Sequence, residues 1–225
     1  MKKIGIIGAM PVEIEIIKNE LEDFYIETHA GLDYYIGKIK DIEIILSVCG
    51  VGKVNAAIYT QVLIDHYSVD AIINTGVAGG LSDDIEHLSV VISNQLTYHD
   101  VCKTQMISLF PNQEFFKADD DLIELAARAS KLNNLDYYIG TIISGETFIS
   151  DSRKKKELHQ NYKAICVEME GAAIAHTAFV NKVPFLVIRC ISDLSNEAST
   201  EDYKNFEKLA AHKSAKLVKE MIYNL

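Results

Sequence analysis

Short apolar runs recur along this chain, and each of them ends in a polar or glycine-rich segment. Runs of this length favour buried strands, whereas the stretches between them carry apolar residues at helical spacing. Alternating strands and helices are typical of an α/β fold around a largely parallel or mixed sheet. The runs are Ile4–Ala9, Ile44–Cys49, Ala71–Asn74, Ile142–Ser144, Lys163–Val167 and Phe185–Ile191.

No composition break or low-complexity linker divides the sequence, so one domain over residues 1–225 is expected. A chain of 225 residues is long enough for one domain with a full core. Helices are expected at Val12–Leu21, Val54–Asp65, Leu122–Lys131, Ser152–Gln160 and Asp202–Asn224. Further β-structure is expected at Tyr34–Ile39, Ile42–Cys49, Val90–Ser93, Leu96–Tyr98 and Tyr137–Ser144.

Three segments carry weaker patterns. Thr75–Gly80 consists of small residues and is expected to be a loop after a strand. Val101–Lys117 has no clear period and contains several phenylalanines, which predicts a long loop used for binding or for an interface. The basic run Arg153–Lys156 is interpreted as the solvated face of a helix, because exposed charge is common.

Charge and hydropathy exclude two classes of partner. The formal net charge of −10 argues against a nucleic-acid-binding surface, which requires a basic footprint. No apolar run approaches the length of a membrane span. The apolar stretch near the N-terminus is too short for a signal peptide and predicts a first strand instead.

The cysteines and histidines show no metal-binding pattern. None of the four cysteines forms a Cys-x-x-Cys pair, and the seven histidines have no His-Glu-x-x-His spacing. Cys49, Cys166 and Cys190 lie in apolar runs, so we expect buried free thiols in a reducing cytoplasm. No metal or cofactor is expected.

Several carboxylates lie directly after predicted strands. Glu168 and Glu170 flank the start of a helix rich in small residues, Glu13 follows the first strand, and Asp193 follows Phe185–Ile191. Each could simply be a helix cap or a first-turn acid. Because ligands in α/β sheets bind outside the carboxyl ends of the strands, Glu13, Glu170 and Asp193 could also surround one pocket. Such a pocket suits acid–base chemistry on an uncharged, hydroxyl-rich substrate.

Phosphate-binding motifs are absent from the glycine-rich segments. The segment from Gly50 to Asn55 lacks the third glycine of a dinucleotide fingerprint and fails the P-loop pattern, since Val54 follows the lysine. The chain has only three arginines, Arg128, Arg153 and Arg189, and arginine is the favoured bidentate partner of phosphate. This argues mildly against a phosphate substrate.

Taken together and in order, the motifs resemble those of the bacterial 5′-methylthioadenosine/S-adenosylhomocysteine nucleosidases, in the purine nucleoside phosphorylase superfamily. The resemblance runs from about Lys3 to Leu225. The segments that carry it are Ile6–Met10 with Glu13, Gly50–Val54, Asn74–Gly80, Tyr98–Asp100, Phe116–Asp119, Ser144–Ile149, Val167–Glu170 and Ile191–Asp193.

The resemblance implies an α/β/α three-layer sandwich around a mixed sheet, and hydrolysis of the bond between adenine N9 and ribose C1′. The substrates would be 5′-methylthioadenosine, S-adenosylhomocysteine and 5′-deoxyadenosine, in methionine salvage. It also implies a homodimer with the 101–116 loop at the interface. Glu13 would activate water, and Asp193 would protonate adenine N7 with help from Ser192. The other substrate-binding residues would be Val51, Ala78, Gly79, Phe148, Ile149, Met169, Glu170 and Tyr203.

The chain departs from the family pattern in places, and alternatives stay open. Pro11-Val12 precede Glu13 where the family often has a glutamate-rich run, and Val77 stands where a serine is common. One alternative is a phosphorylase, which would need arginines around its anion. A second is a nucleosidase for 6-amino-6-deoxyfutalosine. A third is an inert nucleoside-binding module, whose mark would be loss of Glu13 or Asp193.

Overall fold

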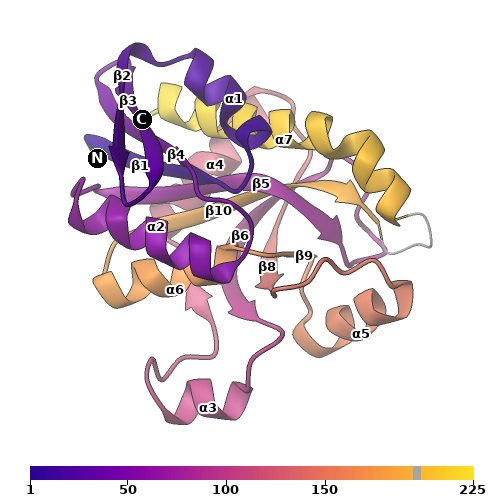
Figure 1. Ribbon diagram of the computed structural model, residues 1–225. Coiled ribbons are helices and arrows are strands. Elements are labelled where there is room, and N and C mark those ends of the chain that lie inside the picture. The colour runs from indigo at the N-terminus through magenta and orange to yellow at the C-terminus, as the bar shows by residue number, and fades with distance from the viewer. Residues whose placement is uncertain (195–198) are drawn as a thin grey trace.

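The computed structural model describes residues 1–194 and 199–225 (Figure 1). Its strands are β1 (Lys3–Gly8), β2 (Glu22–His29), β3 (Leu32–Ile39), β4 (Ile42–Val48), β5 (Ala71–Gly80), β6 (Val90–Tyr98), β7 (Phe116–Lys117), β8 (Tyr137–Ser144), β9 (Cys166–Glu168) and β10 (Phe185–Asp193). Its helices are α1 (Pro11–Asn19), α2 (Lys53–Asp65), α3 (Lys103–Ser108), α4 (Asp120–Leu132), α5 (Ser152–Tyr162), α6 (Gly171–Asn181) and α7 (Ser199–Tyr223).

The strands form one mixed sheet in the order β10-β6-β8-β9-β5-β1-β4-β3-β2, with β7 beside β6. β1 runs parallel to both β4 and β5, whereas β2, β3 and β4 form an antiparallel meander. β10 also pairs with β5, in parallel register along almost its whole length. This additional pairing closes β5, β9, β8, β6 and β10 into a ring.

Helices cover both faces of the sheet. α7 packs along α1 and α4 on one side, against β5 and β10. α2 and α6 pack together on the other side, and α6 also contacts β6, β8 and β10. Figure 1 shows α7 and α1 above the sheet and α2 and α6 below it. The expected α/β/α arrangement around a mixed sheet is therefore confirmed, although the sequence did not predict that part of the sheet closes on itself.

Helix boundaries follow from local chemistry. Pro11 occupies the first turn of α1, where its missing N–H is not needed. The carboxylate of Asp119 accepts a hydrogen bond from the Leu122 backbone N–H (3.0 Å) and caps α4. Asp151 caps α5 in the same way through the Lys154 backbone N–H (2.8 Å). These caps determine where α4 and α5 begin.

The small-residue segment Thr75–Gly80 is not a loop but the second half of β5, so that prediction was wrong. β10 pairs with it from Ile188 opposite Thr75 to Asp193 opposite Gly79, with a register shift between Ile191 and Asp193. β9 pairs with Gly79 and Gly80 on the other edge. This pairing stabilises the extended backbone despite the low strand propensity of glycine.

Two further segments differ from expectation. Val101–Lys117 is not an unstructured loop, because it contains α3 and β7, and α3 projects from the body of the molecule (Figure 1). β2 was not predicted at all. It is an edge strand with most of its residues exposed, so it lacks the buried alternation by which strands are found in a sequence.

All four cysteines are free, and Cys49, Cys166 and Cys190 are buried, as expected. Among residues 1–194 and 199–225, no helix is both long and apolar enough to cross a membrane.

Candidate active site

One pocket gathers every residue that the sequence nominated for catalysis or substrate binding. It lies at the carboxyl ends of β1, β5, β9 and β10 and encloses about 600 Å³, including its open mouth. The nominated residues in its wall are Glu13, Val51, Ala78, Gly79, Phe148, Ile149, Met169, Glu170, Ser192, Asp193 and Tyr203. The structure brings these residues together around one pocket, and their roles stay predictions.

Glu13 is buried in the first turn of α1 and points back toward β1. Its Oε2 accepts hydrogen bonds from the backbone N–H groups of Ala9 (2.7 Å) and Met10 (2.9 Å). Its Oε1 accepts one from Val77 N–H (3.1 Å) on β5. Burial raises the pKa of the Glu13 carboxyl above its usual range, and the nearby Arg189 charge and these backbone donors oppose the rise.

β5 lets these groups approach closely because residue 76 is glycine. A Cβ added at Gly76 would lie 2.5 Å from Glu13 Oε1 and would also clash with the Arg189 guanidinium. The small-residue segment therefore has a defined purpose. It leaves room for a carboxylate and a guanidinium against the backbone of the strand.

Arg189, on β10, is the charged centre of this region, and the sequence argument did not place it there. It is fully buried and bonded to Glu168, and its Nη2 lies 3.7 Å from Glu170 Oε2. Burial opposes its charge, but the carboxylates of Glu168, Glu170 and Glu13 outweigh that effect and raise its pKa. The Arg189 charge is thus paired with carboxylates of the protein itself.

Glu168 and Glu170 have different surroundings. Glu168 accepts hydrogen bonds from the Gly171 backbone N–H (2.7 Å) and the Ser144 hydroxyl, besides Arg189, so it anchors the start of α6. Glu170 faces the pocket, and its Oε1 accepts a hydrogen bond from Gly52 N–H (2.8 Å). Burial first, and then repulsion by Glu168, raise the pKa of Glu170.

Asp193 lies at the end of β10 with both carboxylate oxygens engaged. Oδ1 accepts a hydrogen bond from the Ser192 hydroxyl (2.9 Å), and Oδ2 lies 2.5 Å from the ammonium of Lys155. Lys155 belongs to the basic run at the start of α5 and is fully buried. The interpretation of Arg153–Lys156 as a solvated face is therefore wrong for Lys155, because α5 packs with that residue inward.

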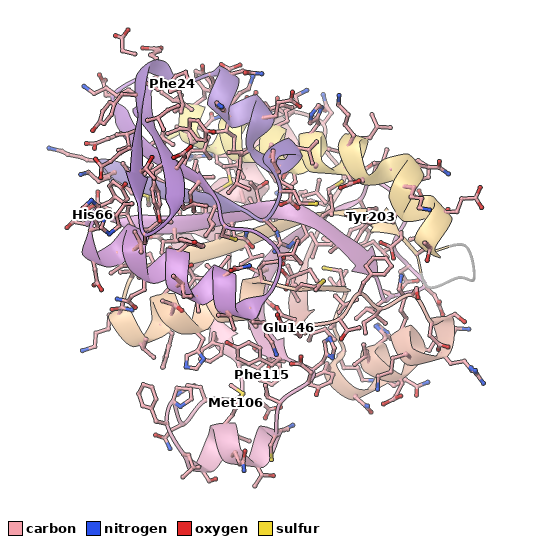
Figure 2. All side chains as sticks on the ribbon, viewed as in Figure 1. Phe24, His66, Met106, Phe115, Glu146 and Tyr203 are labelled. Atoms are coloured by element: carbon pink, nitrogen blue, oxygen red, sulfur yellow. The ribbon has the colours of Figure 1, made fainter. Side chains whose placement is uncertain are left out.

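Apolar side chains line the rest of the pocket. The rings of Phe148 and Tyr203 meet edge to face at the rim, with centroids 5.4 Å apart. Tyr203 belongs to the first turns of α7 (Figure 2), and its hydroxyl donates a hydrogen bond to Glu207 (3.0 Å). Phe148 is 43% exposed and lines the pocket. Val51 is also exposed at the mouth.

The segments at the mouth are tied together by one carboxylate. Asp100 accepts hydrogen bonds from the Lys53 ammonium (2.7 Å) and from the Glu146 backbone N–H (2.8 Å). Glu146 lies close to the start of α2 (Figure 2), where its carboxylate accepts a hydrogen bond from Lys53 N–H (3.3 Å). This cluster joins the segments after β4, β6 and β8.

The chemistry of the wall is that of carboxylates in an apolar cavity. Among the pocket-lining residues that the structure describes, none is lysine or arginine. The two buried cations nearby, Lys155 and Arg189, are both bonded to carboxylates. No cluster of potential metal ligands occurs in the described residues. The arrangement suits proton transfer and stabilisation of positive charge, not anion binding.

Comparison with known proteins agrees with this chemistry. A family model described as the phosphorylase superfamily matches residues 3–223. A 5′-methylthioadenosine/S-adenosylhomocysteine nucleosidase from Staphylococcus carnosus is 39% identical over 227 residues, which cover 99% of this chain and 100% of the relative. The chain belongs to this nucleosidase family.

Solved structures of the family have the same fold. The nucleosidase of Neisseria meningitidis, solved in complex with methylthio-immucillin-A, matches with a TM-score of 0.94 at 33% identity, covering 100% of both chains. The futalosine hydrolase of Helicobacter pylori matches with a TM-score of 0.93 at 31% identity, covering 100% of this chain and 98% of the other.

Two features of this nucleosidase-family chain could not be found by sequence reasoning. Arg189 lies in an apolar strand and Lys155 in a basic run, and neither stands in a motif that signals a site. Val77 stands where the family often has a serine, but it is the backbone N–H of Val77 that donates a hydrogen bond to Glu13. Holding Glu13 thus needs no particular side chain at that position.

Proposed function

We propose that the chain hydrolyses the N-glycosidic bond of 5′-methylthioadenosine and S-adenosylhomocysteine, releasing adenine and the 5-substituted ribose. The same chemistry extends to 5′-deoxyadenosine. The observation that carries the proposal is the set of three buried carboxylates, Glu13, Glu170 and Asp193, around one apolar pocket whose described lining residues include no lysine or arginine. Family membership and the named relatives support it.

Asp193 is assigned as the acid. Adenine departs poorly as an anion, so protonation at N7 lowers the barrier to breaking the C1′–N9 bond. Asp193 must carry a proton while the purine is bound, and the Ser192 hydroxyl beside its Oδ1 orients the carboxyl group. Phe148 stacks on the purine, and the backbones of Ala78, Gly79 and Ile149 lie along the wall that the base would contact.

Glu13 is assigned as the base that activates water. The ribose becomes oxocarbenium-like as the bond breaks, and nearby carboxylates stabilise the developing positive charge. The backbone donors at Ala9, Met10 and Val77 favour the ionised form of Glu13. The burial that raises its pKa makes it a stronger base than an exposed glutamate.

Glu170 is assigned to the ribose hydroxyls, beside Met169. Its carboxylate faces the pocket while Gly52 N–H fixes one of its oxygens, so the other is available to a hydroxyl donor. Val51 and Tyr203 line apolar parts of the pocket that suit an alkylthio substituent. No phosphate is needed in this arrangement.

The deciding test is adenine release from 5′-methylthioadenosine in phosphate-free buffer and again with phosphate. We expect equal release in both, with methylthioribose as the second product. Release only with phosphate, giving a sugar 1-phosphate, would move the assignment to a phosphorylase. No release in either buffer would favour the binding-module alternative.

A second candidate substrate is 6-amino-6-deoxyfutalosine, and the likeness to the Helicobacter pylori futalosine hydrolase favours testing it. It shares the adenine and ribose that the proposed site would contact, and differs only in the 5′ substituent. Comparing kcat/KM for this nucleoside and 5′-methylthioadenosine would rank the two. We expect 5′-methylthioadenosine to be preferred, because the mouth at Val51, Phe148 and Tyr203 is apolar.

We also propose a homodimer in a reducing cytoplasm. Large apolar side chains are exposed on the segment around α3, and Phe110 is 77% exposed. Val54 and Ile58 on α2 and Phe179 on α6 are exposed as well, on two helices that pack together. A second copy of the chain would cover these side chains. The four free cysteines fit a reducing compartment.

A further inference from the structure

The buried lysine beside the proposed acid has no assigned role. Lys155 is fully buried on α5, where neighbouring Lys154 and Lys156 are exposed. A buried ammonium is costly unless it is paired and hydrogen-bonded. Here Nζ lies 2.5 Å from Asp193 Oδ2 and donates a hydrogen bond to the Leu194 carbonyl (2.8 Å). The sequence therefore places a cation inside the molecule at a cost that only its partners offset.

The pairing distinguishes the two oxygens of Asp193. Oδ2 faces the Lys155 ammonium and also Gly79, where an added Cβ would lie 2.9 Å from it. Oδ1 faces the Ser192 hydroxyl. An ammonium has three donors and no acceptor, so an oxygen that contacts it must accept and cannot carry the proton toward it. A protonated Asp193 therefore holds its proton on Oδ1.

We propose that Lys155 is a positioning residue for Asp193, which directs the transferable proton to Oδ1 and stabilises the carboxylate left behind. This inference rests on the proposed function. In the step, the Asp193 Oδ1–H bond breaks and the N7–H bond forms, while the electron pair of the C1′–N9 bond passes to N9 of adenine. The oxygen of water forms the new bond to C1′, and Glu13 takes the proton that water loses. The new carboxylate remains beside the Lys155 ammonium, a charge-assisted contact in a buried site.

The test is the variant Lys155→Met, which keeps most of the length of the side chain and removes its charge. We expect kcat for 5′-methylthioadenosine to fall about 10- to 100-fold, part of the 10²–10⁴ typical of a whole general acid. KM should change less than about threefold, because Lys155 does not line the pocket and KM reports ground-state binding when chemistry is slow. Lys154→Met, on the exposed neighbour, is the matched control and should retain wild-type kcat.

Two further variants separate positioning from a merely structural role. Lys155→Met/Asp193→Asn should be no slower than Asp193→Asn alone, since a residue that acts through Asp193 has nothing left to act on. This double variant also removes the unpaired buried charge, so it remains informative if Lys155→Met is unstable. Lys155→Ala should regain activity with added propylammonium chloride, which returns a cation to the vacated space.

Wild-type kcat in Lys155→Met would overturn the inference, as would a double variant more than tenfold slower than Asp193→Asn. Lys155 would be structural only if propylammonium failed to restore activity to Lys155→Ala and the fall in kcat of Lys155→Met were matched by an equal fall in its folded fraction. Failure of the proposed function is seen separately in the unmodified chain. If that chain releases no adenine, both proposals fall, whereas normal release with an unaffected Lys155→Met removes only this one.

Discussion

At the scale of single residues, the site keeps acidic groups where burial opposes their ionisation. Glu13 and Glu170 are both buried, and burial is the largest cause of the raised pKa of each carboxyl. Arg189 opposes that rise at both carboxyls, and backbone N–H groups oppose it further. Burial of these carboxyls costs local stability, and it places a proposed base and a proposed ribose ligand in the pocket.

Asp193→Asn tests the acid. An amide has nearly the same shape but no proton of comparable acidity, so we expect kcat to fall by about 10²–10⁴-fold, the range for loss of a general acid. Circular dichroism should be unchanged, and a nucleoside analogue should still bind in calorimetry. Turnover near the wild-type rate would remove Asp193 as the proposed acid.

Glu13→Gln tests the base. The glutamine amide oxygen can accept the hydrogen bonds from the Ala9 and Met10 backbone N–H groups, but the amide NH2 cannot accept the one from Val77. Glutamine also cannot take a proton from water, so hydrolysis should fall by about 10²-fold or more. Ligand binding, measured by titration calorimetry with 5′-methylthioadenosine, should survive. Normal hydrolysis by this variant would exclude Glu13 as the essential base.

Glu170→Gln should stabilise the fold while weakening substrate binding. The pKa of Glu170 is raised from 4.5 to about 8 in the folded chain, so the wild-type protein loses stability as pH rises from 4.5 to about 8. The neutral glutamine escapes this loss. At pH 8 we expect Tm to rise by about 2–4 °C, the shift for about 1 kcal/mol in a chain of this size.

The gain should largely disappear by about pH 3.5, because there the wild-type carboxyl is mostly protonated in both the folded and unfolded states. Differential scanning calorimetry at both pH values measures it. A variant less stable than wild type at pH 8 would show that Arg189 and Gly52 already outweigh burial at this carboxylate.

At the scale of elements, β5 matters most for the site because its second half is built of small residues and pairs with β10, which carries Arg189 and Asp193. Gly76→Ala would place a methyl group 2.5 Å from Glu13 Oε1. We expect kcat to fall at least about tenfold, because a displacement of about 1 Å at a catalytic group can cost 10²-fold. The measurement is kcat per folded molecule, with unfolding followed separately.

Gly31→Ala is the matched control for this substitution. Gly31 has φ +78° and no atom within 4 Å of an added Cβ, so the change costs stability through backbone strain alone. Its kcat should equal that of the wild type. Equal losses of activity in Gly31→Ala and Gly76→Ala would show that stability, not displacement of Glu13, explains the effect.

At the scale of the whole molecule, the exposed apolar side chains around α3 bear on assembly; Met106 and Phe115 mark this segment in Figure 2. Analytical ultracentrifugation should give twice the chain mass of 25.1 kDa. Introducing Leu109→Asp with Phe110→Asp, at positions 62% and 77% exposed, should give the single-chain mass without unfolding. Tyr25→Ser, an exposed aromatic on β2, should leave the dimer intact, and a wild-type monomer would reject the proposal.

Much of the fold could be predicted because strands buried on both faces leave continuous apolar runs, as in Ile4–Ala9 and Phe185–Ile191. The carboxylates of the site could be predicted because they follow such runs. β2 could not, since an exposed edge strand has no burial pattern. Nor could Lys155, since burial of one lysine among three is decided by how α5 packs, and the local sequence holds no trace of it.

The ring formed by β5, β9, β8, β6 and β10 has a consequence for folding. Its last strand, β10, supplies Ser192, Asp193 and Arg189, and it must pair with both β5 and β6 to complete the ring. Until β10 has paired, the Arg189 guanidinium does not face Glu13, and the pocket lacks Asp193, the proposed general acid. During refolding, catalytic activity should therefore return only when the ring closes, later than the helical circular dichroism signal. The rate at which adenine release recovers would then measure the rate of ring closure.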